Sequence, residues 1–191
     1  MTIGKTRLRL SAALLLGLLL PPAWAGELTL EQLMAGLRAR GDIRAQFVET
    51  KHLAVLRGVM EVRGTLEFRQ PDYLKREHTS PRAEIYEIEA GTITISQPGK
   101  ASKQVALADF PPLAAFIDSL RAILSGDADT IERLYRTELS GTDQAWTLTL
   151  TPRDRNLADY IDWVKLEGRE QRLIRIETQE AIGDRSVLEL K

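Results

Sequence analysis

The 191-residue sequence contains no cysteine, which excludes a disulfide framework and any metal site that needs thiolate ligands. Histidine is also scarce: His52 and His78 are the only two, too few for a typical three-ligand catalytic zinc site without fixed carboxylate partners. The sequence has no G-x-S-x-G nucleophile motif, H-E-x-x-H motif or glycine-rich phosphate loop. Either histidine could act as a general base, but no nucleophile or orienting partner accompanies it. We therefore expect no metal, no cofactor and no enzymatic activity.

Long hydrophobic runs are scarce as well. The main one, Leu10–Leu20, has 11 residues, whereas a membrane-spanning helix needs about 20. Three basic residues precede it, and an A-x-A sequence, Ala23–Ala25, follows it. This pattern is typical of a secretory signal peptide. We predict a signal peptide over residues 1–25 and an exported, soluble chain over residues 26–191.

Neither sign of charge dominates the expected mature chain. Without the first 25 residues it has 23 basic and 27 acidic residues, a net charge of −4. The basic residues are interspersed with acidic ones and form no stripe, so we expect no nucleic-acid partner. The remaining 166 residues suit a single domain, and we expect a monomer.

Alternating apolar and polar residues characterise the stretch from residue 46 to residue 97 and predict successive β-strands. On one strand the apolar face holds Val62, Leu66 and Phe68. Gly64 lies on that same face, where the missing side chain allows a bend or a close approach. The next strand begins with Leu74, but Arg76 and His78 follow on its apolar face and interrupt the row.

Two amphipathic helices are predicted. The first begins at a capping box formed by Thr29 and Gln32 and ends near Gly41. The second is expected to be capped by Asp109, to have two prolines in its first turn and to end at Gly126. Its apolar face comprises Leu113, Phe116, Ile117, Leu120 and Leu124.

Further strand patterns follow the second helix, and the clearest is the run from Trp146 to Thr151. In total, about nine to eleven strands in sequence with few helices exclude a βαβ crossover fold. So many strands also exceed what a flat open sheet usually holds. We predict a mainly β, α+β fold: a curved antiparallel sheet with helices against its concave face.

Several motifs resemble those of the LolA-type periplasmic carriers of outer-membrane lipoproteins. The run from Phe47 to Gly91 contains G-T-L-E-F-R-Q-P-D-Y-L at its centre. Three further motifs, Glu49–Leu56, Trp146–Asp154 and Gly183–Val187, are similar to those of a LolA-related branch. The resemblance covers nearly all of residues 26–191 and implies an unclosed β-barrel with helices as a lid over a hydrophobic cavity for acyl chains.

The resemblance also implies how the lid is held. In such carriers an arginine directly before the proline of the strand turn holds the lid shut, and a tryptophan follows in the next strand. Here Gln70 precedes Pro71, Arg69 is one residue earlier, and Arg76 occupies the tryptophan position. We therefore consider Arg69, Gln70 and Arg76 as candidates for gating.

The curved sheet and the second helix together define the predicted ligand contacts, although any single member could belong to an ordinary core. The predicted set is Phe47, Val62, Leu66, Phe68, Leu74, Tyr86, Ile88, Phe116, Ile117, Leu120, Leu124, Trp146, Leu148, Leu150 and Trp163. We expect the apolar face of the second helix to pack into the cavity when it is empty and to move aside when it is loaded.

By resemblance, the implied function is to carry acylated lipoproteins or related lipids through the periplasm, from an inner-membrane donor complex to an outer-membrane acceptor. The related branch is associated with lipid or polyene-pigment biosynthesis, so an accessory carrier in such a system is an alternative. A periplasmic lipid-sensing or interaction module with the same fold is another. An enzyme ranks third because no nucleophile can be named.

Overall fold

The computed structural model describes residues 28–55 and 58–191. The expected signal peptide, residues 1–25, and Leu56 of the Glu49–Leu56 motif lie outside these ranges. No helix in the described ranges is both long enough and apolar enough to span a membrane. The helices are α1 (Leu30–Arg40), η1 (Leu107–Asp109), α2 (Pro111–Ser125), α3 (Ala128–Leu134) and α4 (Arg155–Ala158).

Eleven antiparallel strands form one sheet in the order β6-β5-β4-β3-β2-β1-β11-β10-β9-β8-β7. Within the described residues β6 and β7 are its two edges, so the sheet is not closed. The strands are β1 (Ile43–His52), β2 (Val59–Arg69), β3 (Tyr73–Ser80), β4 (Glu84–Glu89), β5 (Thr92–Ser96), β6 (Lys103–Ala106), β7 (Tyr135–Thr142), β8 (Ala145–Pro152), β9 (Ile161–Arg169), β10 (Arg172–Glu180) and β11 (Arg185–Leu190).

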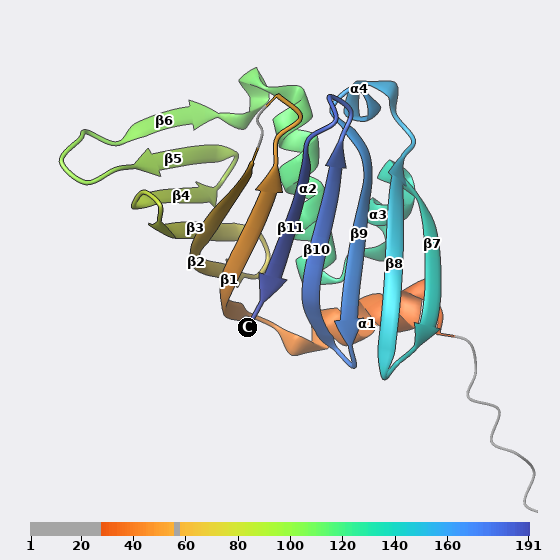
Figure 1. Ribbon diagram of the computed structural model, residues 1–191. Helices are drawn as coiled ribbons and strands as arrows, with labels where there is room; N and C mark the ends of the chain where they lie inside the picture. Colours follow the sequence, from red (N-terminus) through yellow and green to blue (C-terminus); the bar gives the residue numbers. More distant parts are fainter. Residues whose placement is uncertain (1–27, 56–57) are drawn as a thin grey trace, which may run out of the picture.

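The sheet is two meanders joined side by side. Strands β1 to β6 form the first and β7 to β11 the second, and the join is the pairing of β1 with β11, in which Phe47 lies opposite Leu190. The sheet curves around α2 and α3, while α1 crosses one end (Figure 1). This arrangement confirms the predicted unclosed antiparallel barrel with helices against its concave face.

The sequence correctly predicts how α1 begins and packs. Thr29 and Gln32 form both hydrogen bonds of the capping box, and Leu33, Met34 and Leu37 are buried. A link between helices was not predicted: Arg38 Nη2 donates a hydrogen bond to the Gly126 carbonyl oxygen at 2.7 Å. This bond holds α1 to the C-terminal end of α2.

The predicted cap of α2 was wrong. Asp109 belongs to the short helix η1, and the N-cap residue of α2 is Phe110, whose side chain makes no capping hydrogen bond. Pro111 occupies the first helical position, where its missing N–H costs nothing and its fixed φ suits the helix. The helix therefore starts without a polar cap, and it ends at Gly126 in the left-handed conformation, as predicted.

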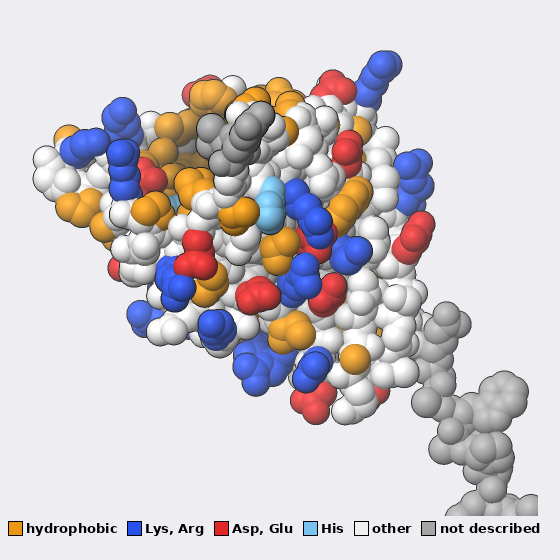
Figure 2. Space-filling model, viewed as in Figure 1, with side chains coloured by type: hydrophobic (Ala, Val, Ile, Leu, Met, Phe, Trp, Pro, Cys, Tyr) orange, Lys and Arg blue, Asp and Glu red, His pale blue; other side chains and the backbone are white. Residues whose placement is uncertain are grey.

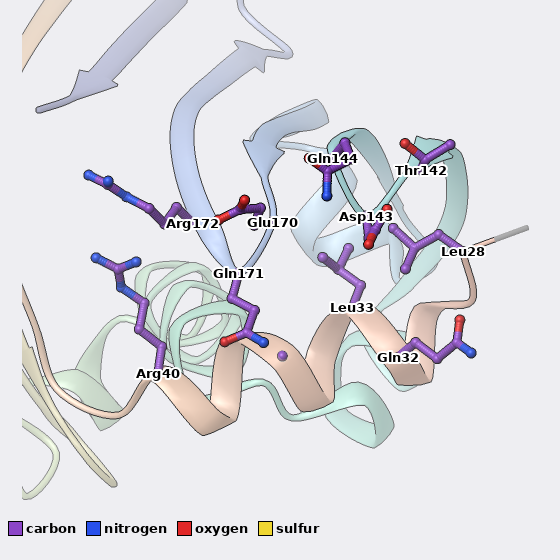
Figure 3. Close-up of a pocket in the computed structure, with 11 residues that line it drawn as sticks. Leu28, Gln32, Leu33, Arg40, Thr142, Asp143, Gln144, Glu170, Gln171 and Arg172 are labelled. Atoms are coloured by element: carbon purple, nitrogen blue, oxygen red, sulfur yellow. The ribbon is translucent and has the colours of Figure 1, made fainter. Parts of the chain in front are cut away.

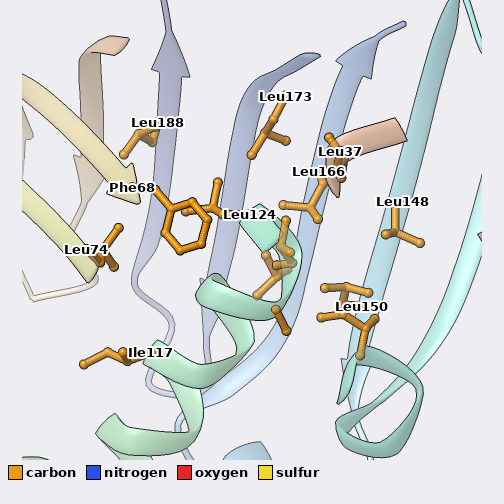
Figure 4. Close-up of a cluster of buried hydrophobic side chains, with 14 of the residues drawn as sticks. Leu37, Phe68, Leu74, Ile117, Leu124, Leu148, Leu150, Leu166, Leu173 and Leu188 are labelled. Atoms are coloured by element: carbon orange, nitrogen blue, oxygen red, sulfur yellow. The ribbon is translucent and has the colours of Figure 1, made fainter. Parts of the chain in front are cut away.

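The hydrophobic core lies between the concave face of the sheet and the helices. Side chains from β2, β3, β8, β9, β10 and β11 point toward α2 (Figure 4). The core also contains one polar pair, in which the buried Tyr135 hydroxyl donates a hydrogen bond to Ser119 Oγ at 2.7 Å. Ser119 in turn donates to the Ala115 carbonyl oxygen, so both buried hydroxyls are satisfied.

Candidate functional site

The structure brings nearly all of the predicted ligand contacts together on the concave side. Those that are buried are Phe47, Val62, Leu66, Phe68, Leu74, Ile88, Ile117, Leu124, Trp146, Leu148 and Leu150. Three others, Tyr86, Phe116 and Leu120, are partly buried and pack against this core. The predicted apolar face therefore exists as one continuous surface.

Trp163 does not belong to this surface, so its predicted placement was wrong. It shares a sheet face with Lys165, whose Nζ lies 5.2 Å from the indole ring centroid, whereas Val164 and Leu166 are buried on the concave face. Pairing of β9 with β10 is regular from Trp163 to Leu166, so simple alternation places Trp163, one position from Val164, on the outer face. The ladder is irregular only beyond it, where Gln179 pairs with Trp163 but Glu180 pairs with Ile161, and this extra residue returns Ile161 to the buried face.

The space beneath α2 is filled by side chains. The cavity between α2 and strands β8, β9 and β10 measures only about 20 Å³ and is lined in part by Phe116, Leu120 and Leu150. That volume is close to the minimum for a single water molecule. The helix thus occupies the interior where the acyl chains were expected.

A larger cavity of about 360 Å³ lies at the N-terminal end of α2. Its apolar lining comes from Phe110, Leu113 and Phe116 on one side and from Tyr160 and Ile161 on the other. Leu113 was predicted to pack inward, but it is 40% exposed and lies at the mouth of this cavity. Phe116 lines both cavities and therefore lies between the mouth and the filled interior.

Exposed large apolar side chains gather at this end of the molecule. They are Val55, Val59, Met60, Phe110, Leu113, Tyr160 and Ile182. The turns that carry them are neighbours: the backbone N–H of Ala54 donates to the Asp184 carboxylate, and that of Ala181 donates to the Tyr160 carbonyl oxygen. Figure 2 shows hydrophobic side chains near the start of α2 and the β1–β2 turn, whereas acidic and basic residues intermix over the strands in front. Such a group of exposed apolar side chains is typical of an interaction site.

Polar side chains interrupt the apolar concave face at β1 and β3. Glu49, which is 4% exposed, forms an ion pair and hydrogen bond with Arg76 Nη2 and lies 3.5 Å from Lys51 Nζ. The Arg76 guanidinium carbon lies 4.7 Å from the Phe47 ring centroid. The sequence signalled Arg76 and His78 as breaks in an apolar row but not their partner Glu49, because the pairing of strands is not visible in the pattern of one strand.

The gating candidates separate in the structure. Arg69 is exposed, pairs with Glu67 and stacks on Tyr73, its guanidinium carbon 3.8 Å from the ring centroid. Gln70 is also exposed and donates to the Arg38 carbonyl oxygen of α1 at 3.3 Å. Arg76 alone among the three lines the cavity beside α2. The structure thus places Arg76, and not Arg69 or Gln70, next to the expected lid.

His78 lies farther along β3 on the same concave face. Its ring centroid is 5.2 Å from that of Tyr86 and 6.0 Å from that of Phe47. Burial, and next the positive charge of Arg76, lower the pKa of His78 below its usual value. Burial and the hydrogen bond to Glu84 raise the pKa of Tyr86 to about 12. Both side chains are therefore neutral at pH 7.

This lowered pKa predicts a pH dependence of stability. The folded state binds a proton at His78 less tightly than the unfolded state does. Neutral His78 therefore contributes fully to the free energy of unfolding above the unfolded-state pKa near 6.5, and this contribution is lost as the pH falls. We expect the urea midpoint of the wild type to fall more between pH 7.5 and pH 5.5 than that of His78→Gln. The exposed His52 supplies the control: His52→Gln should follow the wild type, and equal falls in all three proteins would contradict the prediction.

A cavity of about 810 Å³, larger than the two beside α2, lies between α1 and the β7–β8 and β9–β10 turns (Figure 3). Polar and charged side chains such as Gln32, Asp143 and Arg172 make up most of its lining, with Leu28 and Leu33 as the large apolar exceptions. None of the predicted ligand contacts lines it. It lacks the apolar walls that an acyl chain requires.

One protein family and several solved structures match this chain. The family described as outer membrane lipoprotein carrier protein LolA-like matches residues 23–189. A LolA superfamily protein from Nitrosomonas europaea is 13% identical, with 86% of this chain and 92% of that chain covered and a TM-score of 0.44. The lipoprotein LppX from Mycobacterium tuberculosis is 10% identical over 83% and 93% of the two chains, with a TM-score of 0.45. A chain in the structure of the MucA/MucB complex of Pseudomonas aeruginosa is 13% identical, with 84% of this chain and 55% of that chain covered and a TM-score of 0.47. A search of curated sequences found no match.

Proposed function

The chain belongs to the LolA-like family of outer membrane lipoprotein carrier proteins, and on this basis we propose that it carries acyl chains of lipoproteins or related lipids through the periplasm toward the outer membrane. Membership of a carrier family favours binding and transfer over catalysis. The observation that supports the proposal most directly is the placement of α2, whose apolar face fills the concave side of an unclosed sheet.

In the proposed mechanism α2 acts as the lid. In the empty protein Phe116 and Leu120 occupy the interior, and on loading they move aside as acyl chains take their place. The exposed apolar side chains that line the mouth, Phe110, Leu113 and Tyr160, provide the surface over which a chain enters and leaves. An inner-membrane donor complex and an outer-membrane acceptor are the partners that this role requires.

The free energy of chain burial supports a lid that opens at some cost. A buried CH₂ contributes about 0.8 kcal/mol, so one chain of about 15 methylenes contributes roughly 12 kcal/mol and three contribute roughly 36 kcal/mol. The latter exceeds the limit of about 18–21 kcal/mol for non-covalent binding. Expelling α2 from the interior offsets part of this gain, which keeps the complex reversible and lets an acceptor remove the cargo.

Native mass spectrometry with lipid extraction tests the proposal. The protein is purified from a periplasmic fraction without detergent and then sprayed under non-denaturing conditions. Co-purifying acylated species are the expected result, and their masses identify the cargo class. An unmodified mass that stays unshifted after incubation with lipoproteins, phospholipids and polyene lipids would contradict a carrier and favour a sensing or interaction module.

A further inference from the structure

The cavity beside the N-terminal end of α2 has two chemically different walls. The apolar wall consists of Phe110, Leu113, Phe116, Tyr160 and Ile161, and the polar wall of Glu49, Lys51, Arg76, Thr178, Glu180 and Ser186. The polar wall comes from strands β1, β3, β10 and β11 of the concave face. A purely apolar chain would cover these polar groups without offering them new partners, and burying polar groups without compensation is unfavourable.

On the polar wall, Arg76 retains hydrogen-bonding capacity that the protein does not use. The Glu49 carboxylate already accepts a hydrogen bond from Arg76 Nη2 and lies within ion-pair distance of Lys51 Nζ. Arg76 Nε, by contrast, is buried and has no hydrogen-bond partner among the described residues. A guanidinium has five N–H donors and no acceptor, so a ligand group that completes the hydrogen bonding of Arg76 must bring acceptor oxygens.

Both basic residues of the polar wall lie around one carboxylate. Arg76 and Lys51 supply two positive charges and share the carboxylate of Glu49. The fourth charged residue, Glu180, forms no ion pair with either of them among the described residues, and burial and repulsion from Asp184 raise its pKa. Arginine bonds carboxylate and phosphate oxygens especially well.

The position of Arg76 is also fixed in advance. Its guanidinium stacks over the Phe47 ring, with Cζ 4.7 Å from the centroid, and the ion pair with Glu49 holds one edge of the guanidinium. Phe116 faces the same cavity and separates it from the filled interior beneath α2. A ligand anchored at Arg76 would therefore have its apolar part directed toward the region that the lid occupies.

Resting on the proposed carrier function, we propose that this cavity is a headgroup subsite that binds the anionic oxygen of an amphiphile, a carboxylate or a phosphate, through Arg76 and Lys51. The acyl chain of the amphiphile then continues past Phe116 beneath α2. The protein thus selects its cargo by headgroup charge as well as by chain, which a uniformly apolar cavity cannot do.

Matched amphiphiles test the subsite. Dodecanoate, methyl dodecanoate and dodecyl phosphate share one chain and differ in headgroup, and each is titrated, below its micellar concentration, against the mature protein by competition with a fluorescent fatty acid. We expect both anions to bind at least tenfold more tightly than the neutral ester. The tighter of the two anions identifies the headgroup class.

The variant must remove the site without leaving a buried charge. Arg76→Gln alone would leave the Glu49 carboxylate without its main counter-ion, so the double variant Glu49→Gln/Arg76→Gln is used, with the exposed Arg69→Gln as control. The double variant should lose the preference for anions and bind the ester within twofold of wild type, while the control keeps the preference. Equal binding of all three amphiphiles by wild type, or a preference that survives in the double variant, would overturn the subsite alone. Failure of wild type to bind any of them would also count against the carrier function.

Discussion

Replacing Phe116 with Glu should abolish uptake of acyl chains while the protein stays folded. Phe116 lies in α2 between the mouth cavity and the filled interior, so a carboxylate at this position places a charge on the path of the chain. Desolvating that charge is costly, and we expect affinity for a fluorescent fatty acid to fall more than tenfold. Leu120→Glu, which alters the lining of the inner cavity, should have the same effect.

The control for this prediction is Ile182→Glu. Ile182 is 72% exposed in the β10–β11 turn, at the same end of the molecule, and it lines neither cavity. The substitution therefore introduces the same acidic side chain in place of an apolar one, but away from the path of the chain. It should bind the probe as the wild type does. Far-ultraviolet circular dichroism verifies folding in all variants. Unchanged binding by folded Phe116→Glu and Leu120→Glu would show that α2 is not the lid.

The largest effect on stability is expected for Gly64→Ala. A Cβ atom at Gly64 would lie 1.8 Å from the Glu77 carbonyl oxygen and 2.9 Å from Phe47 Cε1. The first of these atoms belongs to the backbone of β3, which cannot retreat without breaking the β2–β3 pairing, already irregular beside Gly64. Overpacking against a rigid neighbour is among the most destabilising changes. We expect a loss of about 3 kcal/mol or more in the free energy of unfolding.

Urea unfolding measures this loss, and Gly99→Ala serves as its control. Gly99 has a φ of 74° in a turn, and a Cβ there would have no atom within 4 Å. Its replacement therefore costs only the strain of the left-handed backbone, about 1 kcal/mol. Similar losses for the two variants would mean that β3 can shift and that the close approach at Gly64 is not a constraint.

Local patterns in the sequence predicted the elements and most of their faces. The capping box at Thr29 and Gln32 defines the start of α1 because its partners are three residues apart. The alternation around Leu66 and Phe68 correctly places both on the concave face, since successive side chains of a strand point to opposite sides. These features depend on interactions within a few residues of the chain.

Two errors arose where the chemical type of a side chain suggested a role that its position does not allow. Trp163 is large and apolar, yet alternation with the buried Val164 and Leu166 places it on the outer face beside Lys165. Similarly, Asp109 resembles a helix cap in sequence, yet η1 includes it and Pro111 starts α2 without it.

The sequence by itself determined the fold class, the apolar faces and the family, because periodicity and motifs are properties of consecutive residues. Only the tertiary structure decided that β1 pairs with β11, that α2 fills the concave side, and that Glu49 meets Arg76 there. The two residues of that pair are 27 positions apart and come together only because β1, β2 and β3 lie side by side. Charge complementarity across a sheet depends on strand order and register, and neither is written in the alternation of a single strand.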